Sequence, residues 1–371
     1  MNHTKRNRHG NQRFWNGITL AALLLTVAAV SSSPISAAAL APATQAAQPV
    51  DHKVIFIQGI NSESGNGSCD GVGFIEDGQN RVQWMVDYLV GTPWVTESAP
   101  SLDSIEDFSY FSYSGIYCTK TDGSLNLQKP GYSDGDTCAG VRNAAGRLDD
   151  MVDLILLDDP DAKITFITHS MGGMVASGWV RLHPEMVDRV NSVITFDSPL
   201  RGIPNSILEA RDEDLRFPCI PFCSQSWDDL ECDDFTRIPS NCSSEVVPGI
   251  VEVGDSVPFF TIDATRDDLF LIEFVPGDRT TLLSSNSKLH CAFGDNHATI
   301  WNRGETDGLP VGCWRGFTYP NDVLDGDPGP PDFRISSPSD DIKSIFVACV
   351  VTLDLEACKS QPVSAASPPF P

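Results

Sequence analysis

The sequence predicts an α/β fold, in which a mainly parallel β-sheet is flanked by helices on both faces. Short runs of β-branched and aromatic residues, typical of strands buried on both faces, alternate along the chain with segments whose apolar residues recur at helical spacing. This order implies right-handed crossover connections between parallel strands. The chain of 371 residues is long enough for one large domain of this class with insertions.

The individual elements follow from these patterns. Val54–Ile57 is a continuous β-branched and aromatic run, and it is predicted to be the first buried strand. Val141–Ile155 has an apolar stripe at helical spacing and is predicted to be a helix that ends before Pro160. Strands are expected at residues 54–57, 107–113, 164–167, 193–196 and 257–262. Helices are expected at residues 79–90, 141–155, 174–182 and 342–351.

Two stretches interrupt the alternation of strands and helices. Residues 202–254 are rich in cysteine and low in periodicity, and an insertion of that size in a compact domain is usually a lid or a binding element. Residues 304–338 are rich in Pro, Gly and Asp and precede a short apolar helix. The predicted organisation is a domain at 52–360 with a disulfide-rich, lid-like insertion at 202–254, followed by a disordered tail at 361–371.

The amino terminus has the pattern of a secretory signal. Basic residues precede an apolar run from Ile18 to Val30, which at about thirteen residues is too short to span a bilayer. Ala37–Ala39 offers a small-residue cleavage site. We expect residues 1–39 to be a signal peptide and residues 40–51 a flexible leader, so that the mature protein is extracellular and has no integral membrane segment. A retained N-terminal anchor is the alternative.

All eleven cysteines follow this segment, and in an exported protein they are expected to form disulfides. Spacing alone does not determine the connectivity, but it favours local pairs. The locally economical pairs are Cys118 with Cys138, Cys291 with Cys313, and Cys349 with Cys358. Two more bridges, or alternatively a zinc site, are expected among Cys219, Cys223, Cys232 and Cys242. The odd thiol is assigned to Cys69.

The charge balance excludes some partners. The chain has 50 Asp and Glu residues against 25 Lys and Arg residues, a net charge of −25. Such an acidic protein is not expected to bind nucleic acid or anionic membrane surfaces. The sequence does not determine the oligomeric state.

The run Thr168–Gly173, THSMGG, has the form of a nucleophile elbow. An elbow needs a buried strand, a small residue two positions before the serine, a glycine two positions after it, and then a helix. The serine lies on a strained turn that lifts its hydroxyl above the sheet. Thr168 replaces the commoner first glycine and is still fairly small. A strand and a helix are predicted on either side of the motif, so Ser170 is the predicted nucleophile.

A serine nucleophile needs an imidazole as its general base. Around such an elbow the chain order is serine, acid and then histidine, so a histidine late in the sequence is expected. His297 lies on a polar loop after an apolar run and is the predicted base. His290 is the alternative.

The acid that orients this imidazole is expected on a loop between the serine and the histidine, at the end of a strand. Asp267 follows the strand predicted at 257–262 by a short loop and is the predicted acid. Asp268, Asp263 and, more distantly, Asp197 are the alternatives. In so acidic a chain, each could instead be an aspartate that caps a loop.

Two backbone N–H groups are expected to hold the oxyanion that forms during acyl transfer. One belongs to Met171, the residue after the nucleophile, and the other to Ile60, on the loop after the first strand. Gly59 has no side chain and therefore lets the backbone turn closely under a substrate. A simple strand-ending turn is the alternative for this loop.

The motifs that indicate a family occur in a fixed order: Gln58-Gly59-Ile60, Thr168–Gly173, Asp197–Gly202, Asp267-Asp268-Leu269 and His297. With them the chain resembles secreted bacterial lipases and esterases of the α/β-hydrolase superfamily, and also the inositol-deacylase-like lipases. The resemblance covers residues 52–301. It implies the α/β-hydrolase fold and the hydrolysis of a small-molecule or lipid carboxylic ester through an acyl-serine, and no cofactor or metal is expected.

The chain departs from the family pattern at two places. Gln58 stands where the family usually has histidine, and Asp197–Leu200 replaces the more usual Gly-Thr-Pro-His. Both departures leave the subfamily and the substrate open. The same triad could also serve an acyltransferase or a peptidase, and a hydrolase-fold binding protein that has lost catalysis is a further alternative.

Overall fold

The structure is a computed structural model. It describes residues 51–59, 75–76, 79–80, 82–93, 95, 102, 107–113, 118–119, 125–126, 134–200, 202–204, 231–232, 257–264, 287–293, 300, 311–315, 333–335 and 342–352. The predicted signal at 1–39, nearly all of the leader at 40–51, most of the insertion at 202–254 and the tail at 361–371 lie outside these residues.

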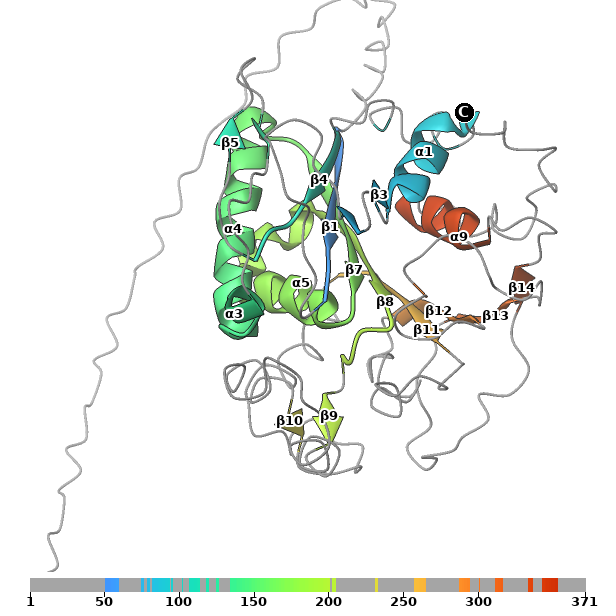
Figure 1. Ribbon diagram of the computed structural model, residues 1–371. Coiled ribbons are helices and arrows are strands. Elements are labelled where there is room, and N and C mark those ends of the chain that lie inside the picture. Colours follow the sequence, from blue (N-terminus) through green and yellow to red (C-terminus); the bar gives the residue numbers. More distant parts are fainter. Residues whose placement is uncertain are drawn as a thin grey trace, which may run out of the picture. The chain divides into compact units, whose positions relative to one another are not determined.

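An eight-stranded sheet forms the centre of the described chain (Figure 1). In spatial order its strands are β14 (Phe333–Ile335), β13 (Val311–Arg315), β12 (Ser287–Phe293), β11 (Phe259–Ala264), β8 (Val190–Phe196), β7 (Lys163–His169), β1 (His52–Ile57) and β4 (Phe108–Tyr110). All neighbouring strands from β4 to β12 pair in parallel, and β13 and β14 continue the sheet antiparallel. The carboxyl ends of the parallel strands therefore share one edge, where α/β proteins place their ligands.

Helices cover both faces of this sheet (Figure 1). On one face α5 (Met171–Leu182) contacts β1, β7 and β8, and α4 (Val141–Asp158) packs against α5. On the other face α9 (Ile342–Val351) packs on β8, and α1 (Gln83–Gly91) packs against α9. The smaller helices are α3 (Asp134–Thr137) and η2 (Pro184–Arg189). Two-stranded sheets join β2 (Ile75–Glu76) to β3 (Gln79–Asn80), β5 (Cys118–Thr119) to β6 (Leu125–Asn126), and β9 (Ile203–Pro204) to β10 (Glu231–Cys232).

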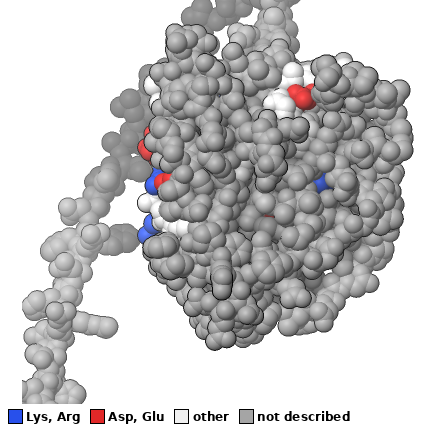
Figure 2. Space-filling model, in the orientation of Figure 1, with Lys and Arg blue, Asp and Glu red and all other residues white. Residues whose placement is uncertain are grey.

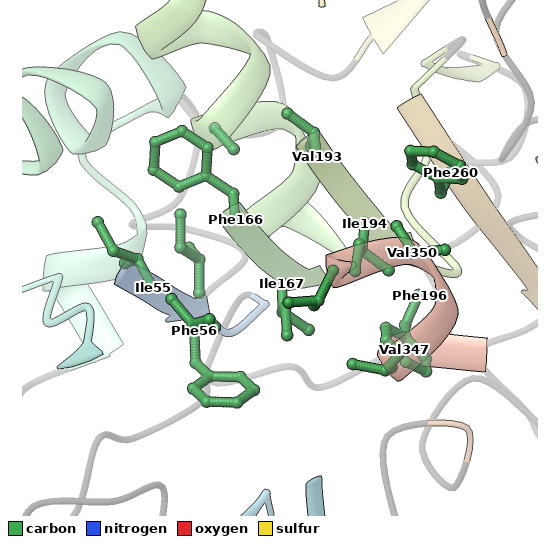
Figure 3. Close-up of a cluster of buried hydrophobic side chains, with 14 of the residues drawn as sticks. Ile55, Phe56, Phe166, Ile167, Val193, Ile194, Phe196, Phe260, Val347 and Val350 are labelled. Carbon is green, nitrogen blue, oxygen red and sulfur yellow. The ribbon is translucent and has the colours of Figure 1, made fainter. Parts of the chain in front are cut away.

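Apolar side chains fill the space on both sides of the parallel strands. Two adjacent rows in register across β1, β7 and β8 are Ile55, Phe166 and Val193, and then Phe56, Ile167 and Ile194. Successive residues of a strand point to opposite faces, so the two rows contact different helices. Figure 3 shows Ile194 beside Val350 of α9, with Phe166 on the opposite face. The strands are therefore buried on both faces, as their continuous apolar runs predict.

The predicted strands and helices are present in the structure, with ends that differ by a few residues. The strand expected at 107–113 is shorter, because β4 ends at Tyr110. The helix expected from Gln79 begins at Gln83, because Gln79–Asn80 is β3 and pairs with β2.

The sequence predicts no strand within residues 304–338, but the structure has two there. β13 and β14 lie in this stretch and extend the sheet beyond β12. With five and three residues, these strands are too short to show a clear periodicity. Their pairing depends on a neighbouring strand that is distant in the sequence.

The predicted disulfide between Cys291 and Cys313 is present and joins β12 to β13. The two residues are partners in the antiparallel register, with Cα atoms 4.2 Å apart. Cys138 and Cys349 are also disulfide-bonded. Their partner cysteines are not among the described side chains, so the predicted pairs with Cys118 and Cys358 stay predictions, as do the predictions for the other cysteines.

No helix in the described part of the chain combines the length and the hydrophobicity that a membrane span requires. Among the described side chains visible in Figure 2, a basic and an acidic one lie next to each other at the left edge. Described ion pairs include Lys53–Asp107, with an N–O distance of 2.7 Å, and Arg147–Asp136, at 3.9 Å. Both pairs are partly buried, with side-chain exposures of 22% and 9% in the first and 26% and 23% in the second.

A buried polar network lies at the amino end of β1. His52 is 7% exposed, and its Nε2 atom is 2.7 Å from Oγ1 of Thr165. The side-chain amide of Asn191 donates to the same Thr165 oxygen at 3.1 Å and to the carbonyl oxygen of Val351 at 3.3 Å. The network therefore connects β1 and β7 to the last residue of α9. Burial lowers the pKa of His52 from 6.5 to about 4, because the imidazolium would lose its hydration.

Acid should weaken the fold through His52. Below pH 6.5 the unfolded chain binds a proton at this residue, whereas the folded chain leaves the imidazole neutral down to about pH 4. The stability contributed by the neutral form is complete above pH 6.5 and is lost as the pH falls through this window, by up to about 3 kcal/mol. Urea unfolding at several pH values should show a shallower loss for His52→Gln than for the wild type. Equal pH dependence in the two proteins would contradict this assignment.

Candidate active site

Ser170 lies on a sharp turn between β7 and α5. Its φ of 53° and ψ of −129° fall in a region that residues other than glycine rarely adopt. Two backbone hydrogen bonds hold the turn: the Ser170 N–H donates to the carbonyl oxygen of Phe196 at 3.0 Å, and the Gly173 N–H donates to that of Ser170 at 3.1 Å. A strained serine between a buried strand and a helix is the geometry of a nucleophile elbow.

Three glycines make this turn sterically possible. A Cβ atom at Gly59 would lie 2.6 Å from Cβ of Ser170, and one at Gly172 would lie 2.3 Å from the last carbonyl oxygen of β1. A Cβ atom at Gly173 would lie 2.3 Å from Oγ of Ser198. Each of these separations is too short for real atoms. The end of β1, the elbow and the first turn of α5 therefore pack together with no side chain between them.

The helix that follows Ser170 gives the site an electropositive end. Met171 is the first residue of α5 and is 1% exposed. The first N–H groups of a helix have no acceptor within the helix, and the aligned peptide dipoles make this end attractive to anions. The Met171 N–H, one of the two predicted oxyanion donors, thus belongs to a helix end beside Ser170.

Thr168 stands where the elbow motif more commonly has glycine. Its side chain is fully buried and its hydroxyl donates to the carbonyl oxygen of Ile194 at 3.0 Å. The extra side chain is accommodated because its polar atom binds the neighbouring strand β8.

A second buried polar group follows β8, the strand next to β7. Asp197 is fully buried, has a φ of 46°, and donates its N–H to the carbonyl oxygen of Ile262 at 2.7 Å. Ser198 is also fully buried, and its Oγ atom, like Oγ1 of Thr195, has no hydrogen-bond partner among the described atoms. The residue before Asp197 accepts the hydrogen bond from Ser170, so this carboxyl group lies at the same sheet edge as the elbow.

The predicted acid, base and second oxyanion donor lie outside the described residues. These are Asp267, His297 and Ile60, and the alternative acid Asp268 lies outside them as well. Asp267 follows the end of β11 by three positions in the chain, and His297 follows the end of β12 by four. Both strands run parallel to β7, so their carboxyl ends are at the same edge as Ser170.

The remaining alternatives for the acid and the base differ in their position relative to the strands. Asp263 lies within β11, in register with Ala292, and His290 lies within β12, in register with Thr261. Asp197 instead follows the end of its strand, which is where loop residues of a triad are expected. Among the alternative acids it is the one whose side chain the structure describes.

Sequence reasoning missed two features of this edge. The first is the left-handed backbone of Asp197, because no composition pattern marks a positive φ outside glycine. The second is Tyr113, whose hydroxyl donates to the carbonyl oxygen of Gln58 at 2.5 Å. These residues are 55 positions apart, and only the pairing of β1 with β4 brings them together.

One comparison with known families matches the segment around Ser170. A model of the family described as "PGAP1-like alpha/beta domain" matches residues 149–209, which contain β7, the elbow, α5 and β8. Among curated proteins, the phospholipase A(1) LCAT3 of Arabidopsis thaliana is 46% identical over 46 residues. These residues make up 12% of this chain and 10% of the plant enzyme, so the match spans about a tenth of that relative.

Solved structures of lipases are also similar. The phospholipase PlaB from Legionella pneumophila is 15% identical, with 58% of this chain and 38% of that chain covered at a TM-score of 0.37. The lipase BlEst2 of Bacillus licheniformis, in its mature form, is 11% identical, with 69% of this chain and 88% of that chain covered at a TM-score of 0.35.

Gly172→Ala should destabilise the protein by roughly 1–3 kcal/mol, because the new Cβ atom would force α5 away from the backbone of β1. Gly146→Ala is the matched control, since a Cβ atom there, on α4, meets nothing within 4 Å. The control should raise the stability by up to about 1 kcal/mol through helix propensity alone. Urea unfolding measures both changes. A Gly172→Ala variant as stable as the wild type would show that this close approach is not required.

Proposed function

We propose that this chain, which has the α/β-hydrolase fold, is a serine carboxylic-ester hydrolase with Ser170 as its nucleophile. The similarity of the segment around Ser170 to a PGAP1-like alpha/beta domain supports this proposal. The observation that supports this most is the strained backbone of Ser170 at the start of α5. A turn of this kind costs of order 1–3 kcal/mol, and such strain concentrates at catalytic positions.

The proposed reaction is acyl transfer to water. The Ser170 hydroxyl oxygen attacks the ester carbonyl carbon while the imidazole of His297 takes the hydroxyl proton. The tetrahedral intermediate collapses, the alcohol leaves with that proton, and the acyl group stays on the Ser170 oxygen. A water molecule, deprotonated by the same imidazole, then releases the acid and restores the serine. Asp267 orients the imidazole throughout.

The negative charge on the substrate oxygen is the part of this reaction that the fold is suited to stabilise. The Met171 N–H, at the amino end of a helix of 12 residues, supplies one donor, and the Ile60 N–H supplies the other. Gly59 precedes this second donor, and its backbone approaches Ser170 without a side chain. One such donor contributes about 10²–10³ in kcat in other serine hydrolases.

The proposed substrate is a neutral or zwitterionic lipid ester or a small ester, because the net charge of −25 opposes binding to anionic surfaces. The plant relative is named as a phospholipase A(1), so acyl esters of glycerophospholipids belong to the class to be tested. The basic and apolar amino-terminal segment, together with the many cysteines, supports export of the protein. The proposed chemistry uses no cofactor or metal.

Ser170→Ala should lower kcat for esters by about 10⁴ or more and abolish labelling by a fluorophosphonate probe. Ser177→Ala is the matched control, because this serine is also buried on α5 but donates its hydroxyl to the carbonyl oxygen of Gly173 at 2.7 Å. Activity against p-nitrophenyl esters of graded chain length measures both variants and defines the acyl preference. Retained esterase activity in Ser170→Ala would refute the proposed nucleophile.

The identity of the acid is tested by two isosteric variants. Asp267→Asn should lower kcat by about 10⁴ with little change in the free energy of unfolding, because the imidazole would lose its orienting carboxylate. Asp197→Asn should keep kcat within about tenfold of the wild type if this carboxyl group only supports the loop after β8. Steady-state kinetics of the two purified variants decide the assignment, and the opposite pattern would make Asp197 the triad acid.

A further inference from the structure

The end of β1 is held by a tyrosine that the proposed mechanism does not use. The Tyr113 hydroxyl donates to the carbonyl oxygen of Gln58, the residue between β1 and Gly59. Tyr113 is 2% exposed, and its ring packs edge-on against Phe111 with centroids 5.0 Å apart. The Phe111 N–H in turn donates to the carbonyl oxygen of Phe56 at 2.8 Å. The residues just after β4 therefore continue along β1, and their contacts hold the Tyr113 hydroxyl in place.

The Tyr113 hydroxyl holds the peptide unit that joins Gln58 to Gly59. This unit begins the loop after β1 that carries the proposed second oxyanion donor, here called the oxyanion loop. The carbonyl of Gln58 and the N–H of Gly59 belong to one planar group and point in opposite directions. Glycine adopts many backbone conformations at little cost, so a peptide unit that precedes it can rotate unless another contact holds it. Gly59 has to be glycine here, because a Cβ atom would lie 2.6 Å from Cβ of Ser170.

A second contact limits the same carbonyl from the other side. A Cβ atom at Gly172 would lie 2.8 Å from the Gln58 oxygen, so the first turn of α5 closes directly over it. The oxygen thus lies between the helix backbone and the Tyr113 hydroxyl. Gln58 itself is 3% exposed, so water does not readily replace a lost partner at this carbonyl.

We propose that Tyr113 is a positioning residue for the oxyanion hole: by binding the Gln58 carbonyl, it fixes the peptide before Gly59 and hence the direction of the N–H groups that follow. This inference rests on the proposed function. Tyr113 acts through the backbone of the oxyanion loop, and it neither transfers a proton nor touches the reacting atoms. The hydrogen bond from its hydroxyl limits the rotation of the peptide unit that glycine at position 59 would otherwise allow.

The test compares Tyr113→Phe with Tyr110→Phe in the full chain. Each variant removes one hydroxyl from a buried tyrosine in or just after β4, and the Tyr110 ring stacks on Phe56 with centroids 5.5 Å apart. Both are assayed on an ester and on the matching thionoester. Sulfur is a poor hydrogen-bond acceptor, so the thionoester reaction depends less on the oxyanion donors. The ratio of the two kcat values therefore reports on the oxyanion hole and not on general stability.

Tyr113→Phe should lower kcat for the ester by about tenfold, less than the loss of a whole oxyanion donor, with KM within twofold of the wild type. The ester-to-thionoester ratio should fall by about fivefold, and Tyr110→Phe should leave this ratio unchanged. A wild-type ratio in Tyr113→Phe, or the same fall in both variants, would overturn the proposal.

Phe111→Leu replaces Tyr113→Phe if that variant does not fold. It keeps the hydroxyl but removes the ring against which Tyr113 packs. A ratio equal to that of the wild type would overturn the proposal there too.

Ser170→Ala in the same assay separates the two levels of inference. If Ser170→Ala retains activity, the proposed function fails, whatever the tyrosine variants do. If Ser170→Ala is inactive and Tyr113→Phe has the wild-type ratio, the function stands and the role of Tyr113 is refuted.

Discussion

The close approach of α5 to the end of β1 is the constraint on which the rest of the site depends. Gly172 brings the helix backbone within van der Waals contact of the last carbonyl groups of β1, and Gly59 brings the following loop against Ser170. With both glycines in place, the chain has only one residue in which to turn from β7 into the helix. Ser170 therefore takes a left-handed backbone, and the hydrogen bond to β8 helps to offset that strain.

The same packing explains how the chain tolerates its departures from the usual lipase pattern. At Gln58 the described contacts are made by the main chain, whose carbonyl oxygen receives the Tyr113 hydroxyl, so this interaction does not depend on which side chain stands there. Thr168 fits in place of glycine because its hydroxyl binds a carbonyl of β8. Ser198 lies directly against Gly173, which explains why a short side chain follows Asp197. These departures are therefore compatible with the turn at Ser170.

The remainder of the sheet supports this edge from a distance. α9 covers β8 on the face opposite α5, and the polar network of His52, Thr165 and Asn191 connects its end to the amino ends of β1 and β7. The disulfide between Cys291 and Cys313 joins β12 to the antiparallel strand beside it. β12 is the strand that precedes the predicted histidine, so this covalent link lies close in the chain to the proposed base.

Local patterns in the sequence were sufficient for the parallel strands, the amphipathic helices and the elbow at Ser170, because each depends on residues that are neighbours along the chain. They predicted the disulfide of Cys291 for the same reason, since short loops favour local pairs. β13, β14, the left-handed Asp197 and the bond from Tyr113 to Gln58 leave no such pattern. They exist because strands distant in the sequence lie side by side in the sheet, and the packing of those strands, not the preference of any one residue, determines which backbone groups meet. The sequence by itself therefore determined the fold class and the candidate nucleophile, and only the tertiary structure decided how the backbone around that serine is held.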